Sequence, residues 1–324
     1  MRCIGVHPFW CVRVPRFLLL LLFLLLMIPI LLTACVATPD VPPWFDAIHR
    51  VPVKTVIVVG NRIAYTESGD GPPVILVHGF GGSMWQWEYQ QSLSTSYRVI
   101  TLDVLGSGLS DKPEIEYTPT QLVGFMRNFM DALQIRQASF VGNSMGAGIV
   151  IGMALTYPDR VDKIVLIDGF PELVREKLSS PSLRRALGPW PPVWMVKLGN
   201  WFAGRGTTKR VMREMVYDDG LLTAAVIDRS NRNRQRPGLF PPLRATINNL
   251  PLWENGFAKR IGEIQHPTLI LWGEKDAVFP PLVGEELHRS IVGSRFSLIP
   301  NAGHIAMWER PDVVNLFLLN FLQP

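Results

Sequence analysis

Cysteine is nearly absent from this chain. Its three cysteines stand at positions 3, 11 and 35, and none follows. Residues 36–324 therefore contain no disulfide, no cysteine zinc site and no cysteine nucleophile. The chain also lacks the H-E-x-x-H pattern of zinc peptidases and the glycine-rich phosphate loop of nucleotide-binding enzymes. We expect neither a metal nor a cofactor.

Acidic residues are missing from the first 34 positions, which contain Arg2, Arg13 and Arg16. The net charge of the chain is +5, from 32 basic and 27 acidic residues. Without this segment, 29 basic residues remain against 27 acidic ones, a net charge of +2. The excess positive charge is therefore largely a property of the N-terminus, and we expect no nucleic-acid partner. The composition is 48% hydrophobic and 18% charged, which is typical of a globular domain.

The N-terminus combines these arginines with an apolar run over residues 17–32. This pattern is typical of a secretory signal. The following Leu32-Thr33-Ala34-Cys35 resembles the bacterial lipobox, in which the cysteine receives a diacylglyceryl group and becomes the new N-terminus after cleavage. We predict a lipoprotein signal peptide at 1–34, lipidation of Cys35 and a proline-containing tether at 35–52. This would place a membrane-anchored domain in the cell envelope, outside the cytoplasm.

Two alternatives for the N-terminus stay open. Phe17 to Val36 is 20 residues long, which is about the length that spans a bilayer as an uncleaved anchor. The arginines before it would then keep the N-terminus in the cytoplasm. The other alternative is a cleaved signal followed by an incidental cysteine, which would release the protein.

From residue 53 onward, short apolar runs alternate with segments of helical periodicity. This alternation predicts an α/β fold with a mostly parallel sheet between helices, over residues 53–324. The alternation stops between Ile167 and Thr268, a stretch rich in tryptophan and arginine. A structureless loop of that length is improbable, so we predict a mostly helical lid at 171–262. Such a lid either contacts anionic lipid or simply caps an apolar pocket.

Residues Gly142–Gly146 (GNSMG) match the G-x-S-x-G pattern and lie between a predicted strand and a predicted helix. In this pattern the serine occupies a strained turn, which leaves no room for bulky neighbours. The start of the following helix then places its dipole beside an oxygen that becomes negatively charged. The pentapeptide by itself is equally compatible with a tight strand–helix turn that happens to contain a serine.

The segment His78-Gly79-Phe80-Gly81-Gly82 directly follows another predicted strand. Together with the serine pattern it resembles the α/β-hydrolase fold family, and the resemblance covers about residues 53–324. The resemblance implies that Ser144 is a nucleophile and that the Phe80 and Met145 amides form an oxyanion hole.

The family places its acid and its base late in the chain, in the order Ser–Asp–His. The resemblance implies that Asp276, in Leu271-Trp272-Gly273-Glu274-Lys275-Asp276, is the acid. It likewise implies that His304 is the base. Asp168 also follows a strand and is kept as an alternative acid. We expect structural roles for His78 and for Asp103, which opens a D-x-x-G-x-G-x-S segment.

We therefore predict a serine hydrolase that cleaves an apolar or lipid-like carboxylic ester through an acyl-enzyme on Ser144. Epoxide hydrolases and haloalkane dehalogenases share the pattern but have an aspartate at this position. The elbow also resembles that of C–C bond hydrolases of ring-fission products. Those enzymes usually show Ser-Gly-Pro-Gly where this chain has Phe80-Gly81-Gly82-Ser83. A cofactor-free perhydrolase and a non-catalytic binding protein are further alternatives, and the oligomeric state stays open.

Overall fold

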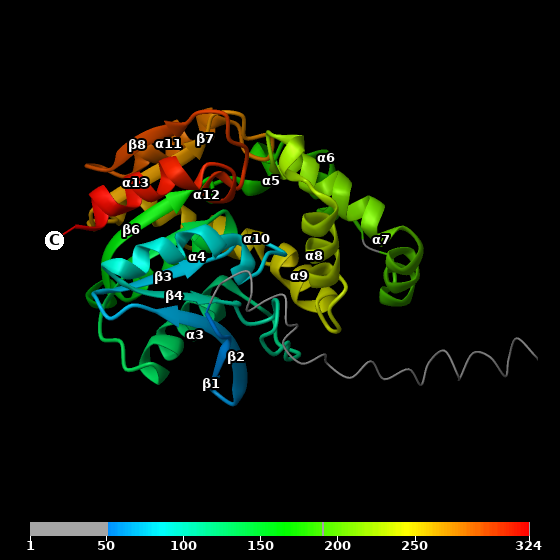
Figure 1. Cartoon of the computed structure of the whole chain (residues 1–324), viewed down its shortest axis with the longest axis horizontal. Coiled ribbons are helices and arrows are strands. Elements are labelled where there is room, and N and C mark those ends of the chain that lie inside the picture. Colours follow the sequence, from blue (N-terminus) through cyan, green and yellow to red (C-terminus); the bar gives the residue numbers. More distant parts are fainter. Residues whose placement is uncertain (1–50, 190, 324) are drawn as a thin grey trace, which may run out of the picture. The chain divides into compact units, whose positions relative to one another are not determined.

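The computed structural model describes residues 51–189 and 191–323 (Figure 1). Its centre is an eight-stranded sheet with the order β1-β2-β4-β3-β5-β6-β7-β8. β1 and β2 are antiparallel to their neighbours, and every later pair is parallel. The predicted α/β fold with a mostly parallel sheet is confirmed. The strands are β1 (Lys54–Val58), β2 (Asn61–Ser68), β3 (Pro73–Val77), β4 (Arg98–Leu102), β5 (Ala138–Asn143), β6 (Val161–Ile167), β7 (Thr268–Gly273) and β8 (Arg295–Ile299).

The sheet begins with a hairpin that joins β1 to β2. Val58 pairs with Asn61, so Val59 and Gly60 form the two-residue turn. Their φ angles are +48° and +76°, as the primed turns of hairpins require. Glycine adopts a positive φ freely, whereas a β-branched valine does so only under strain.

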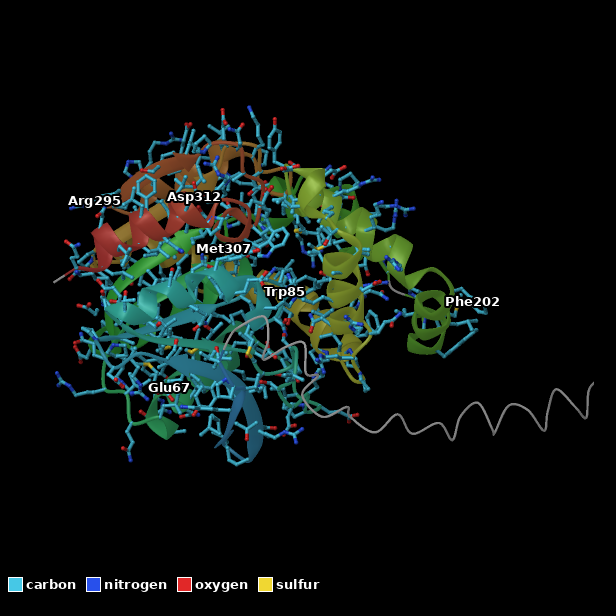
Figure 2. All side chains as sticks on the ribbon, in the orientation of Figure 1. Glu67, Trp85, Phe202, Arg295, Met307 and Asp312 are labelled. Carbon is cyan, nitrogen blue, oxygen red and sulfur yellow. The ribbon has the colours of Figure 1, made fainter. Side chains whose placement is uncertain are left out.

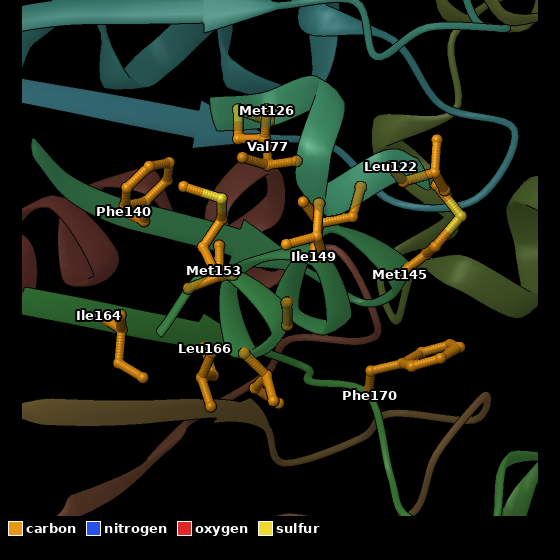
Figure 3. Close-up of a cluster of buried hydrophobic side chains, with 14 of the residues drawn as sticks. Val77, Leu122, Met126, Phe140, Met145, Ile149, Met153, Ile164, Leu166 and Phe170 are labelled. Atoms are coloured by element: carbon orange, nitrogen blue, oxygen red, sulfur yellow. The ribbon is translucent and has the colours of Figure 1, made fainter. Parts of the chain in front are cut away.

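Alternate residues of the strands point to opposite faces of the sheet, which gives two apolar layers. Ile75 and Val77 of β3 belong to one layer, and Val74 and Leu76 belong to the other. Figure 3 shows part of the first layer, where Phe140 of β5 and Val77 lie against helix side chains such as Met126. The helices that pack in this layer include α3 (Pro119–Ala132), α4 (Met145–Thr156) and α11 (Pro281–Ser290).

The second layer is covered by helical segments that come from both ends of the domain. The 3₁₀ segment η1 (Met84–Thr95) contributes the fully buried Trp87. The C-terminal helices α12 (Ala306–Glu309) and α13 (Pro311–Leu322) pack beside it. The short 3₁₀ segment η2 (Pro158–Arg160) leads into β6.

The segment between β6 and β7 is helical in the described residues and lies to one side of the sheet (Figure 1). We call it the insertion; its predicted function as a lid stays a prediction. Its elements are α5 (Val174–Lys177), α6 (Pro181–Ala186), α7 (Val193–Met215), η3 (Asp219–Leu221), α8 (Ala224–Arg234), α9 (Phe240–Asn248), α10 (Leu250–Asn255) and η4 (Ala258–Glu263).

The predicted signal peptide, Cys35 and nearly all of the predicted tether lie outside the described residues. Within residues 51–189 and 191–323, no helix has both the length and the apolar character needed to cross a membrane.

Candidate active site

Ser144 occupies the turn that joins β5 to α4, with φ +52° and ψ −121°. Two glycines make this turn sterically possible. A Cβ on Gly146 would lie 2.2 Å from the Val77 carbonyl oxygen, and one on Gly142 would lie 2.6 Å from the Ala147 amide nitrogen. Both distances are too short for a side chain, so the glycines of the sequence pattern are physically required. Such strained conformations cluster at functional sites.

His304 lies on the loop after β8, and its ring is bound to Asp276, which lies after β7. The distance from His304 Nδ1 to Asp276 Oδ2 is 2.9 Å. The other carboxylate oxygen accepts hydrogen bonds from the amides of Val278 and Phe279, at 2.7 Å and 3.0 Å. Because an ionised carboxylate only accepts hydrogen bonds, Nδ1 carries the proton and Nε2 is left as the basic atom.

The electrostatics of this pair favour the charged form of the ring. Burial lowers the pKa of His304, but the charge of Asp276 and the hydrogen bond to it outweigh burial and raise that pKa above its ordinary value. The pair is almost fully buried, with 4% of the histidine side chain and none of the aspartate side chain exposed. Asp276 is therefore placed to stabilise an imidazolium that forms during a reaction.

Ser144 and His304 lie on adjoining loops. Asn143 Nδ2, one residue before the serine, donates a hydrogen bond of 3.0 Å to the His304 carbonyl oxygen. A Cβ on Gly79 would lie 3.2 Å from Ser144 Cβ, so the Gly79 backbone rests against the serine. The structure thus brings together the serine, histidine, aspartate and glycine-rich segments singled out in the sequence.

The two amides predicted to form an oxyanion hole are both available. Neither the Phe80 amide nor the Met145 amide donates a hydrogen bond to any other described residue. Met145 is the first residue of α4, where amides have no partner within the helix. The Gly79 amide, on the same loop as Phe80, donates a hydrogen bond of 3.4 Å to Gln86 Oε1.

The alternative acid, Asp168, does not form a hydrogen bond with the His304 ring in the described residues. Its two carboxylate oxygens accept from the amides of Gly273, at 2.6 Å, and Ala306, at 3.2 Å. Gly273 is the last residue of β7, shortly before Asp276, and Ala306 is the first residue of α12, shortly after His304. Burial and the charge of Asp276 raise the pKa of Asp168 well above its ordinary range. Asp168 therefore holds two loops in place.

His78 and Asp103 hold backbone segments together, as expected. His78 is fully buried; its Nδ1 lies 2.8 Å from the Gly79 carbonyl oxygen, and its Nε2 accepts from the Val104 amide at 3.1 Å. Asp103 accepts hydrogen bonds from the amides of Met84 and Leu109, at 2.7 Å and 2.6 Å.

Glu309 supports the histidine loop, although no sequence pattern predicts this role. Its Oε2 accepts from the Gly303 amide at 2.6 Å, and its Oε1 accepts from the Tyr217 and Asp218 amides at 2.8 Å and 3.0 Å. The His304 amide donates to the Met215 carbonyl oxygen at 2.7 Å. The end of α7 is thus bonded to the histidine loop. No sequence signal indicates such contacts, because they join segments about ninety residues apart.

A cavity that is partly open to solvent borders Ser144. A second cavity shares Met145, Phe170, Thr246 and Leu250 with it. Among the described residues that line the first cavity, Ser144 and Thr246 are the only ones with polar side chains. Its other lining residues are Phe80, Met145, Phe170, Val174, Leu178, Leu183, Ala186, Leu187, Ile247, Leu250, Val278 and Phe279.

The chain resembles known hydrolases over most of its length. It is 30% identical to a 2-hydroxy-6-oxononadienedioate/2-hydroxy-6-oxononatrienedioate hydrolase from Klebsiella pneumoniae, over 81% of this chain and 91% of the relative. The structure of a meta-cleavage product hydrolase from Pseudomonas fluorescens is 26% identical, with a TM-score of 0.72, over 84% of this chain and 97% of the other. An N-acyl homoserine lactone degrading enzyme is 25% identical, with a TM-score of 0.65, over 83% and 100%.

A comparison with whole protein families agrees with the site, which combines a strained serine, a histidine–aspartate pair and two available amides. The model of the alpha/beta hydrolase fold matches residues 72–311, which is most of the domain described above. This chain belongs to the alpha/beta hydrolase fold family.

Proposed function

We propose that the protein hydrolyses an apolar carboxylic ester through an acyl-enzyme on Ser144. His304 Nε2 takes the Ser144 proton while Oγ attacks the carbonyl carbon, and the Phe80 and Met145 amides bind the resulting oxyanion. His304 then protonates the leaving alcohol. In deacylation His304 takes a proton from water while the water oxygen attacks the acyl carbon, and it returns this proton to Ser144 Oγ when the carboxylic acid leaves. The single observation that carries this mechanism is the Asp276-bound histidine beside a strained serine.

The lining of the Ser144 cavity supports an apolar, uncharged acyl group. No lysine or arginine is among the described residues that border it. A carboxylate placed there would lose its hydration without gaining a cationic partner, which is costly. Arg229 of α8 does not supply this charge to the cavity, because Glu88 binds its guanidinium through two hydrogen bonds of 3.0 Å and 3.1 Å.

A second candidate function is hydrolysis of a C–C bond in a ring-fission product, and the relatives favour it over ester hydrolysis. The Klebsiella pneumoniae relative and the Pseudomonas fluorescens structure both carry names of this class. The substrates named for such relatives are dienoates and dienedioates, which carry one or two carboxylates. The apolar cavity is the observation that leads us to rank the ester first.

Fluorophosphonate labelling tests the nucleophile independently of the substrate. We expect the full-length chain to be labelled and the Ser144→Ala variant to remain unlabelled. An equally folded Ser83→Ala variant, which changes a buried serine on the segment after β3, serves as the matched control and should label like the wild type. Labelling of Ser144→Ala, or no labelling of the wild type, would contradict the proposal. The latter result would favour a non-catalytic binding protein.

A substrate panel separates the bond types. p-Nitrophenyl esters of rising acyl length should give kcat/KM values that increase with chain length, since each buried CH₂ contributes about 0.8 kcal/mol. A dienoate ring-fission product should react more slowly than the best ester. Faster turnover of the dienoate would contradict the proposed ester hydrolysis and support C–C bond hydrolysis. Halogenation dependent on peroxide and a carboxylic acid would indicate a perhydrolase.

The location of the enzyme is a proposal of its own. The sequence supports lipidation of Cys35 and a domain held at the cell envelope outside the cytoplasm. Incorporation of radiolabelled palmitate by the wild type and its loss in Cys35→Ala would support this location. Equal incorporation by both proteins would contradict it.

A further inference from the structure

The outer surface of α7 carries a cluster of large apolar side chains. Trp194, Met195, Leu198 and Phe202 are 65%, 46%, 53% and 78% exposed. Trp194, Leu198 and Phe202 follow one another at intervals of four residues, so they lie along one face of the helix. Phe202 lies at the outer edge of the insertion, away from the sheet (Figure 2). Exposed apolar patches of this kind mark interaction surfaces.

The same helix becomes basic towards its C-terminal end. Arg205, Lys209 and Arg213 continue the line of Trp194, Leu198 and Phe202, and Arg210 lies beside them. The helix holds five basic residues and one acidic residue, a net charge of +4. The acidic residue, Glu214, turns inward, where its carboxylate accepts hydrogen bonds from Ser180 and Ser182.

Two of these basic side chains are partly neutralised, and two are not. Arg205 pairs with Asp228 at 3.1 Å, and Arg213 pairs with Asp219 at 3.2 Å. Lys209 and Arg210 are exposed, and neither forms an ion pair with an acidic residue in the part of the chain that the structure describes. A surface with an apolar first half and a cationic second half complements the boundary between acyl chains and anionic headgroups.

From this complementarity we propose that α7 docks on an anionic lipid surface. The apolar first half enters the acyl-chain boundary, and Lys209 and Arg210 lie among the headgroup phosphates. The sequence predicts a separate lipid anchor at Cys35, and α7 would supply the second membrane contact that stable binding requires. The docking surface does not depend on that anchor or on the bond that Ser144 attacks.

The position of α7 links this surface to the Ser144 cavity. Pro191, Pro192 and Val196, at the start of α7, border a cavity whose other wall includes Phe240 and Arg244 of α9. The same helix α9 contributes Thr246 and Ile247 to the Ser144 cavity. Val196 lies on the opposite side of α7 from Trp194, Leu198 and Phe202, so α7 would lie between a bound membrane and α9, which lines the Ser144 cavity.

Photo-crosslinking tests the docking directly. The full-length chain carries p-benzoyl-phenylalanine in place of Phe202, in a Ser144→Ala background so that no lipid is consumed. It is mixed with vesicles of alkyne-labelled phosphatidylglycerol or phosphatidylcholine. The control carries the same probe at Val292, an isolated apolar residue that is 87% exposed. We expect about fivefold or more lipid adduct at 202 than at 292 on phosphatidylglycerol, because only the former lies in the docking face.

A charge reversal gives the second arm of the test. Lys209→Glu combined with Arg210→Glu should lower the adduct at 202 on phosphatidylglycerol by more than about tenfold, with little change on phosphatidylcholine. Equal adducts at 202 and 292 would overturn the proposal. So would crosslinks from 202 to a second copy of the chain in place of lipid. Because the readout is an adduct and not turnover, loss of the ester hypothesis would leave its result unaffected.

Discussion

His304 can act as a base only through Nε2, because its Nδ1 atom is bound to Asp276 at 2.9 Å. The neutral ring is the active form of a general base. Asp276 raises the pKa of His304 against the opposing effect of burial, so the ring stays protonated to a higher pH than a free histidine. The protonation of His304 should therefore determine how the reactivity of Ser144 depends on pH.

The rate of fluorophosphonate labelling should rise with pH through a pKa above about 6.5, the ordinary value for histidine. The reason is that the proportion of neutral His304 increases over this range. The measurement is the second-order labelling rate between pH 5 and 9. An acid limb centred below about 6.5 would show that burial, not Asp276, dominates the titration.

Asp276 and Asp168 are both candidates for the acid, and their contacts predict different effects of substitution on the labelling rate and on stability. Asp276→Asn should slow labelling by about 10³–10⁴-fold, because the amide cannot hold the required tautomer of His304. Asp168→Asn should slow it far less and instead lower the free energy of unfolding by about 1–3 kcal/mol, since one of its backbone partners is lost. Labelling rates and urea denaturation of both variants check this. If Asp168→Asn were labelled more slowly than Asp276→Asn, Asp168 would be the acid instead of Asp276.

Buried His78 gives the molecule a pH-dependent stability. Burial lowers its pKa, so below about pH 6.5 the unfolded chain binds a proton that the folded chain does not. The unfolding free energy should therefore fall on acidification from about 6.5 towards the lowered pKa, by up to about 1.4 kcal/mol per pH unit. Urea denaturation at several pH values checks this. A His78→Asn variant should lack this part of the slope, and an identical slope would refute it.

At the scale of elements, the strand–turn–helix unit β5–Ser144–α4 depends on close backbone contact. A Cβ on Gly146 would collide with the carbonyl oxygens of Val77 and His78 at 2.2 Å and 2.7 Å. We expect Gly146→Ala to lower the free energy of unfolding by about 1–3 kcal/mol or more and to slow labelling of Ser144. Thermal or urea unfolding of the purified variant gives the measurement.

Gly206 of α7 provides the matched control for this substitution. It is exposed, and a Cβ there meets no atom within 4 Å. Gly206→Ala should therefore raise the stability by up to about 1 kcal/mol through helix propensity. A similar loss for both variants would mean that the close approach at Gly146 is not the cause.

At the scale of the whole molecule, a buried ion pair joins the insertion to the body of the domain. Arg229 of α8 and Glu88 of η1 are 8% and 10% exposed. The guanidinium also lies 4.5 Å from the Trp85 ring centre, and Trp308 Nε1 donates to Glu88 at 2.7 Å. Removing either partner leaves the other charge buried and unpaired.

We expect Arg229→Ala to lower the free energy of unfolding by about 3–5 kcal/mol. Arg289→Ala, at an exposed pair with Glu285, should change it by less than about 1 kcal/mol. Urea unfolding followed by fluorescence and circular dichroism gives both values. If the insertion is coupled to the body through this pair, the two probes should agree in the wild type and separate in Arg229→Ala. Equal losses for the two arginine variants would argue against the coupling.

Sequence patterns were enough to predict the fold class and the strand ends that carry the candidate active-site residues. Its apolar periodicity is local, and parallel strands bring their carboxyl ends to one edge of the sheet. The need for glycines around Ser144 and in the segment at His78 could also be predicted, because it reflects short-range backbone geometry. The catalytic roles of Ser144, Asp276 and His304 stay predictions that the labelling experiments address.

The identity of the carboxylate that binds the histidine becomes clear only in the folded chain. Asp168 and Asp276 each follow a strand, and β6 and β7 are neighbours, so spacing along the chain does not separate them. The geometry assigns Asp276 to the His304 ring and Asp168 to backbone amides. The role of Glu309, the apolar lining of the cavity and the exposed face of α7 likewise arise from packing between distant segments. Burial and exposure are properties of the folded chain, so no local pattern contains them.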